Sequence, residues 1–128
     1  MIYLDTSVAL AQLLEEDRIP PAGLWAKDLA SSRLIAFELW NRIHARRLGK
    51  SHGAAADAIL NRLVLFELTP TILARALEPF PVAVRTVDSL HLATITYLRG
   101  RGQRVELATY DARMAKAARA LEIPIEKL

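Results

Sequence analysis

The feature that most constrains the fold is a unit found near both ends of the sequence: a short apolar run, then an acid, then a helix with apolar periodicity. Residues 2–4 lead into Asp5, and residues 105–109 lead into Asp111. Strands that pass at once into helices are typical of parallel α/β proteins. We therefore expect an α/β fold, a three-layer α/β/α sandwich with a central parallel sheet.

The residues between these two units predict further helices and short strands. Helices are expected after Thr6 or Ser7, after Pro21 through Ala30, at 34–48, at 53–65, after Pro70, and from Thr86 to Gly100 or Gly102; strands are expected at 66–69 and 123–125. Thr6 or Ser7, Thr86 and Asp111 are the predicted N-terminal caps. Gly49 is predicted to end the helix over 34–48 in a left-handed conformation.

Composition and length exclude several classes of protein. With 128 residues, 52% of them hydrophobic and 24% charged, the chain is expected to be one globular domain over residues 1–128. The sequence has no cysteine, which excludes disulfides, zinc–thiolate sites, iron–sulfur clusters and a thiol nucleophile. The weakly polar run at 89–98 is shorter than the about 20 residues that span a bilayer. With no signal peptide recognised either, a cytoplasmic protein without a membrane segment is expected.

Four acids occupy positions that a parallel sheet would bring together. Asp5 and Asp111 follow predicted strands, and Glu38 and Asp88 lie in the opening turns of predicted helices. Ligands of open parallel sheets bind at the carboxyl ends of the strands, where these side chains could meet. Converging carboxylates repel one another unless a cation neutralises them, so the set predicts a Mg²⁺ or Mn²⁺ site that acts on phosphate.

Each acid also has a simpler explanation. Asp5, Asp88 and Asp111 lie near helix N-termini, where a carboxylate can cap the helix. Glu38 and Arg42 are spaced for an exposed i, i+4 ion pair. Thr6, Ser7 and Thr86 could supply the caps beside Asp5 and Asp88, however, and Glu38 lies within the otherwise apolar Phe37-Glu38-Leu39-Trp40. These two details favour a functional site.

Basic residues and one histidine complete the list of candidates. The net charge of +3 and pI of about 9.6 suit a polyanionic partner without identifying one. A possible rail for phosphates follows Glu38 on and beyond its helix, although an ordinary solvated face explains it equally well; its residues are Arg42, Arg46, Arg47 and Lys50. His91, one turn after Asp88, is expected to be a core histidine or a neighbour of the site rather than a metal ligand.

Four motifs in this order carry a resemblance to a known family: L-D-T-S-V-A-L, F-E-L, V-D-S-L-H-L-A-T and L-A-T-Y-D-A-R-M. Together they span nearly all of the chain, which resembles a PIN-domain ribonuclease of the VapC type, the toxin half of a bacterial or archaeal toxin–antitoxin pair. The resemblance implies metal binding by one acid from each motif, Asp5, Glu38, Asp88 and Asp111. It also implies supporting hydroxyls on Thr6 or Ser7 and on Thr109.

The activity implied by the resemblance is hydrolysis of RNA by a water that Mg²⁺ activates, with Mn²⁺ as a substitute. The implied partners are RNA, a cognate antitoxin that alone contacts operator DNA, and a second copy of the chain in a homodimer. Leu24 and Trp25 are the expected antitoxin groove. Some relatives carry a further acid after the fourth motif, where this chain has Ala112-Arg113-Met114, so one metal or two remain possible.

Two other functions are weighed against the nuclease. A metal-dependent phosphatase or a receiver-like domain is disfavoured, because residues 5–7 read Asp-Thr-Ser instead of D-x-D and no acidic pair or late lysine is apparent. A non-catalytic PIN-like module that binds RNA or protein is disfavoured by the presence of all the acids. Replacing Asp5 by Asn separates these cases.

Overall fold

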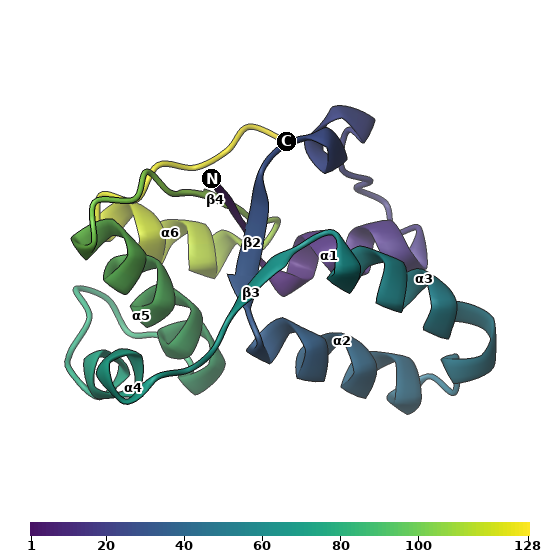
Figure 1. Cartoon of the computed structure of the whole chain (residues 1–128), viewed down its shortest axis with the longest axis horizontal. Coiled ribbons are helices and arrows are strands. Elements are labelled where there is room, and N and C mark those ends of the chain that lie inside the picture. The colour runs from purple at the N-terminus through teal and green to yellow at the C-terminus, as the bar shows by residue number, and fades with distance from the viewer.

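The computed structural model describes residues 1–128, which form a parallel sheet between two layers of helices (Figure 1). The strands are β1 (Ile2–Leu4), β2 (Leu29–Ser32), β3 (Val64–Phe66) and β4 (Glu106–Ala108), in the order β3-β2-β1-β4. On one side of the sheet lie α1 (Thr6–Leu14), α2 (Leu34–Ala45) and α3 (Gly49–Asn61). On the other lie α4 (Pro70–Ala76), α5 (Thr86–Gly100) and α6 (Ala112–Ala120). The expected α/β/α sandwich is confirmed.

The central strand β1 separates two hydrophobic clusters. Ile2 and Leu4 pack with the α1, α2 and α3 layer, while Tyr3 points the other way into the α5 and α6 layer. This alternation follows from the two-residue period of a strand, and a sheet covered on both faces needs an apolar strand at its centre. Burial of each large aliphatic side chain contributes about 1.5–3 kcal/mol, so these clusters hold the two layers to the sheet.

The segment after Pro21 differs most from its prediction. A helix through Ala30 was expected, but the structure has a short 3-10 helix, η1 (Ala22–Ala26), followed by β2. All four residues of β2 are buried between its neighbours, and the Ser31 hydroxyl donates a hydrogen bond to the Leu4 carbonyl at 2.8 Å. Small residues without β-branching gave no strand signal, because the position at the centre of the sheet selects them for size.

Further element boundaries were predicted wrongly, and the helix expected at 53–65 is α3 over Gly49–Asn61. The α2 helix ends at Ala45, and the left-handed residue after it is Arg47, with φ of 57°, whereas Gly49 begins α3. Strand β3 covers 64–66 rather than 66–69. The predicted strand at 123–125 is reduced to a single parallel bridge between Ile125 and Leu107. The helical hairpin of α2 and α3, the helix that begins at Pro70 and the strand within 105–109 are confirmed.

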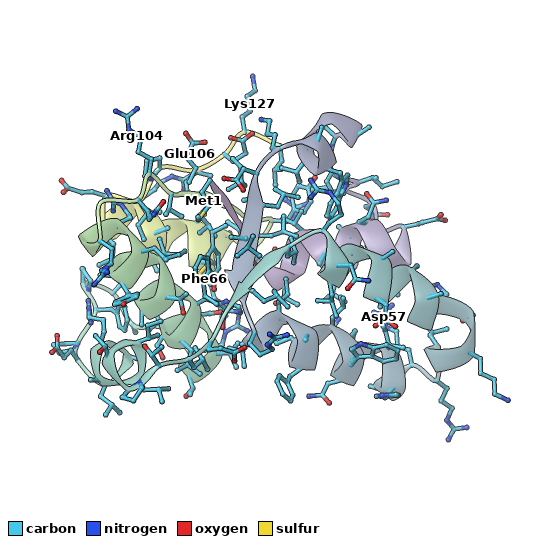
Figure 2. The ribbon with its side chains drawn as sticks, in the orientation of Figure 1. Met1, Asp57, Phe66, Arg104, Glu106 and Lys127 are labelled. Carbon is cyan, nitrogen blue, oxygen red and sulfur yellow. The ribbon has the colours of Figure 1, made fainter.

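The direction of the strands fixes where a site can form. Met1 and Glu106 lie at the end of the sheet where the strands begin (Figure 2), and the Glu106 N–H donates to the Met1 carbonyl at 3.1 Å. The opposite, carboxyl edge is where β1 passes into α1, β2 into α2 and β4 into α6. None of the helices combines the length and the apolar character needed to cross a membrane.

Candidate active site

A cavity of about 400 Å³ lies at the carboxyl edge of the sheet, and all four predicted acids line it. We call it the acid cavity. Asp5 directly follows β1, Glu38 lies in the second turn of α2, Asp88 in the first turn of α5, and Asp111 immediately before α6. The two layers of helices and two strand ends therefore contribute to one site, and the predicted convergence of the acids is seen.

Asp5 is held by hydroxyl groups instead of capping α1. Its Oδ2 accepts hydrogen bonds from the Ser7 hydroxyl at 2.6 Å and from the Thr109 hydroxyl at 2.8 Å, and its side chain makes no capping bond. Neither Thr6 nor Ser7 is the cap that was predicted: Thr6 is the first helical residue, and its buried hydroxyl has no partner. Asp5 itself is 6% exposed. A buried carboxylate with two donors on one oxygen is fixed in orientation.

The same two hydroxyls tie the turn after β4 to the turn after β1. The Ser7 oxygen accepts the Tyr110 N–H at 3.0 Å, and the Thr109 oxygen accepts the Asp111 N–H at 2.9 Å. The resulting network joins residues more than 100 positions apart in the sequence around the Asp5 carboxylate.

Asp88 and Asp111 share one counter-ion, the Arg85 guanidinium. The Arg85 Nε lies 3.2 Å from Asp88 Oδ2, and its other end lies 3.0 Å from Asp111 Oδ2. Burial raises the pKa of Asp88, and the nearby charges of Asp111 and Asp5 raise it further against the opposing effect of Arg85. The carboxylates of the acid cavity therefore act on one another electrostatically.

Of the predicted helix caps at Thr86 and Asp111, the structure has only the one at Asp111. Asp111 is a true cap, because its Oδ1 accepts the N–H groups of Arg113 at 2.9 Å and Met114 at 3.4 Å. Thr86, by contrast, is the first residue of α5, and no side chain caps that helix. Asp111 thus serves α6 with one oxygen while its second oxygen faces Arg85.

Glu38 is not paired with Arg42, as an exposed ion pair would require. Its Oε1 lies 2.5 Å from Nε2 of His91, a fully buried residue of α5. The other ring nitrogen of His91 bonds the Tyr3 hydroxyl at 2.7 Å, and burial raises the pKa of that hydroxyl. The expectation that His91 is a buried neighbour of the site is confirmed by this geometry.

The donor chemistry of the acid cavity suits a hard cation. The cavity offers carboxylate and hydroxyl oxygens without sulfur, which is the ligand type that Mg²⁺ and Mn²⁺ prefer. As the side chains stand, however, no three Asp, Glu or His residues are arranged to hold one ion. Arg85 bonds Oδ2 of both Asp88 and Asp111, and His91 bonds Oε1 of Glu38, so these three oxygens already have partners.

Comparison with known proteins agrees with this geometry. The model of the PIN domain matches residues 2–120. The chain belongs to the PIN-domain family. Ribonuclease VapC35 of Mycobacterium tuberculosis, found in two strains, is 30% identical to this PIN domain over 130 residues, which cover 98% of the chain and 95% of the relative. Ribonuclease VapC47 of the same organism is 28% identical over 126 residues, covering 93% and 90%.

Two more cavities adjoin the acid cavity of this PIN domain. One, of about 560 Å³, shares Ser7, Leu10, Arg42 and Asp111 with it and extends to Tyr110, whose ring lies 5.1 Å from the Arg18 guanidinium carbon. The other, of about 440 Å³, shares Arg85 and Asp88 and extends to Arg113 and Lys116. Because these cavities share lining residues, we call the three together the groove; outside the acid cavity its ionisable side chains include Glu16, Asp17, Arg18, Arg113 and Lys116.

The predicted phosphate rail only partly coincides with this groove. Arg42 lines two of the three cavities, whereas Arg46, Arg47 and Lys50 are exposed and line none of them. Sequence reasoning missed the basic residues that do line the groove, which are Arg18, Arg85, Arg113 and Lys116. A signal was present for Arg85 and Arg113, because each lies within three residues of a predicted acid.

The structure places Leu24 and Trp25, the residues expected in the antitoxin groove, in η1. Leu24 is 2% exposed and belongs to the core. Trp25 is half-buried against that core, and its indole N–H donates to the Gln12 side chain at 3.2 Å. The pair was expected there because tryptophan is favoured at binding surfaces, and of the two only Trp25 keeps partly exposed surface.

Proposed function

We propose that this PIN domain is a Mg²⁺-dependent endoribonuclease and the toxin of a toxin–antitoxin pair, with Mn²⁺ as a substitute for Mg²⁺. The single observation that carries the proposal is that carboxylates from four separate segments line one cavity at the carboxyl edge of the sheet. The names of its relatives, Ribonuclease VapC35 and Ribonuclease VapC47, support the choice of RNA. Of the simpler uses of the acids, helix capping applies to Asp111, and an ion pair with Arg85 applies to Asp88 and Asp111.

The residues of the cavity have separate roles in this proposal. Asp5, fixed by Ser7 and Thr109, would provide ligand oxygens together with Asp88 and Asp111, and Glu38 would provide a further one. A bound divalent cation supplies Lewis acidity, which lowers the pKa of water and neutralises charge on the phosphate. One carboxylate accepts the proton of the attacking water. Because water and not the ribose 2′-OH attacks, the products carry a 5′-phosphate and a 3′-hydroxyl.

The groove provides the path for the RNA strand. Arg42 on one side of the acids, and Arg113 and Lys116 on the other, place positive charge where phosphates flank the scissile bond. Tyr110 with Arg18 offers a stacking surface for an unpaired base. The other predicted residues lie outside the groove and could contact only distant parts of the RNA; they are Arg46, Arg47 and Lys50.

The partners follow from the same proposal. A cognate antitoxin covers the acid cavity and contacts operator DNA, and the toxin pairs with itself as a homodimer. Phe37, 62% exposed beside Glu38, and Val87, 37% exposed in the wall of the cavity, provide apolar surface for the antitoxin segment. Action on cellular RNA places the protein in the cytoplasm.

The test compares RNA cleavage by the wild type and two Asp→Asn variants. With Mg²⁺ present, Asp5→Asn should lower kcat/KM by about 100-fold or more, since each 1.4 kcal/mol of lost transition-state stabilisation is about tenfold in rate. Asp57→Asn is the matched control, because Asp57 is exposed on α3 and lines no part of the groove (Figure 2). EDTA should abolish cleavage, and Mg²⁺ or Mn²⁺ should restore it.

Sequencing of RNA 5′ ends after induction identifies the cleaved bonds. Phosphorylated 5′ ends that appear with wild type and Asp57→Asn, but not with Asp5→Asn, are the expected result. Cleavage that persists in EDTA contradicts the mechanism.

One observation favours a second candidate, the non-catalytic binding module. Arg85 neutralises Asp88 and Asp111, so the acid cavity already has a cation of its own. A binding module would hold RNA or protein equally well with Asp5→Asn and would cut no RNA in any variant. The same cleavage and binding assays therefore decide between the two functions.

A further inference from the structure

A buried polar pair links the core to the acid cavity. Tyr3 of β1 and His91 of α5 are both fully buried, with the hydroxyl 2.7 Å from Nδ1 and the rings edge to face at 5.7 Å. Burying such groups costs free energy unless every one of them is hydrogen-bonded, and an apolar pair of the same shape would fill the space without that requirement. Packing alone therefore does not explain the pair.

The hydrogen bonds determine which protons these residues carry. The Tyr3 oxygen accepts the N–H of Ser32 at 3.1 Å, so its own proton is available to Nδ1 of His91. With Nδ1 as an acceptor, the neutral ring carries its proton on Nε2, which donates to Glu38 Oε1 at 2.5 Å. The chain of bonds thus runs from β2 through β1 and α5 to the acid on α2.

We propose that His91 is a positioning residue for Glu38: together with Tyr3 it holds the Glu38 carboxylate by Oε1 and leaves Oε2 for the contents of the acid cavity. A free glutamate on a helix surface samples several rotamers, and ordering it costs side-chain entropy. Here the Glu38 side chain is 25% exposed and fixed by a donor that is itself immobile in the core. This inference rests on the proposed function, because it assigns Glu38 a ligand to hold.

Substitutions of His91 separate positioning from packing. In His91→Gln the side-chain amide nitrogen replaces Nε2 and can still donate to Glu38, whereas in His91→Asn the amide is too short to reach it. Partners that orient metal ligands typically change metal affinity or activity by about 10–100-fold when they are lost. We expect His91→Asn to raise the Mn²⁺ Kd and to lower kcat within that range with little change in the KM for RNA, and His91→Gln to stay within a few-fold of wild type.

Three measurements complete the test. Mn²⁺ titration without RNA gives the metal affinity, urea unfolding gives the stability, and ¹⁵N NMR of the imidazole gives the tautomer, expected to be Nε2–H. A structural role alone would lower the stability of His91→Asn and leave the Mn²⁺ affinity of the folded protein unchanged. Should the His91 variants fail to fold, Tyr3→Phe removes only the hydroxyl. We expect it to weaken Mn²⁺ binding by a few-fold, and an unchanged Kd overturns the inference.

The outcomes also distinguish this inference from the proposed function. If the wild type binds Mn²⁺ and cuts RNA, and His91→Asn has the same Mn²⁺ affinity and the same cleavage rate, the nuclease function stands and the positioning role is removed. A His91 ring that carries its proton on Nδ1 would also remove the positioning role. A wild type that neither binds Mn²⁺ nor cuts RNA removes the nuclease, and the positioning role with it.

Discussion

Among single residues, Asp88 bears the largest electrostatic cost of the acid cavity. Its side chain is 13% exposed, and burial together with the charges of Asp111 and Asp5 raises its pKa. A carboxyl group with a raised pKa binds its proton more tightly in the folded than in the unfolded chain. Protonation of Asp88 therefore favours folding, and this contribution is lost as the pH rises through the folded pKa.

A first prediction follows for Asp88→Asn, which mimics the protonated acid. In metal-free buffer with EDTA, the variant should have a higher free energy of unfolding than wild type at pH 7. The difference should shrink as the pH falls toward 3.8, the ordinary value for aspartate, because the wild-type carboxyl then becomes neutral too. Urea unfolding at a series of pH values measures it. A difference that grows on acidification contradicts the assigned cause.

Arg85 gives a second prediction at the same scale. Its guanidinium bonds both Asp88 and Asp111, although its side chain is 61% exposed. Because a divalent cation and Arg85 compete for the same two carboxylates, Arg85→Gln should lower the Mn²⁺ Kd by a few-fold when RNA is absent. Isothermal titration of metal into the free protein measures the change. Weaker binding in the variant would mean that Arg85 supports the metal site instead of competing with it.

Among the elements, the hairpin of α2 and α3 depends on the close approach of Gly53 to the Trp40 ring. A Cβ added at Gly53 of α3 would lie 3.1 Å from the Trp40 ring of α2, closer than such atoms normally come. Gly53 is buried, and α2 is the helix that carries Glu38. Unless the Trp40 ring moves aside, a side chain at this position pushes the two helices apart and shifts Glu38 with α2.

The corresponding prediction compares two glycines. Gly53→Leu should lower the free energy of unfolding by about 1–3 kcal/mol, the usual cost of overpacking a core. Gly100→Leu, at the end of α5 where an added Cβ meets nothing within 4 Å, should be neutral or stabilising by up to about 1 kcal/mol because leucine favours helix. Chemical denaturation of both variants measures the contrast. Equal stabilities would show that Trp40 can move aside without cost.

The elements also show what the sequence could predict. The strands before Asp5 and Asp111 and the helix from Thr86 were predicted because their apolar patterns are local properties of the chain. Strand β2 was missed because its small, weakly patterned residues owe their conformation to neighbours on both sides. Propensity is a weak guide where tertiary burial decides.

The candidate site likewise has a part that the sequence could predict and a part that it could not. That Asp5, Glu38, Asp88 and Asp111 would meet could be predicted, because parallel strands place their carboxyl ends at one edge of a sheet. The partners of these acids could not be predicted. The Arg85 bridge depends on how the starts of α5 and α6 lie beside each other. The bond from His91 to Glu38 depends on the distance between α2 and α5, which lie in different layers.

For the whole molecule, the strand order β3-β2-β1-β4 couples the first and last parts of the chain. Strand β1 lies between β2 and β4, and pairs with β4 from Ile2 opposite Glu106 to Leu4 opposite Ala108. Contacts this distant in sequence require a long loop to close, which costs chain entropy. The turn with Thr109 and Asp111 reaches Asp5 only after that closure.

This strand order delays the assembly of the acid cavity during synthesis. A nascent chain that ends between residues 89 and 105 contains Asp5, Glu38 and Asp88 but lacks β4, the Thr109 hydroxyl on Asp5 and the fourth carboxylate. A cell that translates this protein therefore meets no complete cavity on a partly made chain. Under the proposed function, cleavage of RNA therefore requires a chain made at least as far as residue 111, which carries the fourth carboxylate.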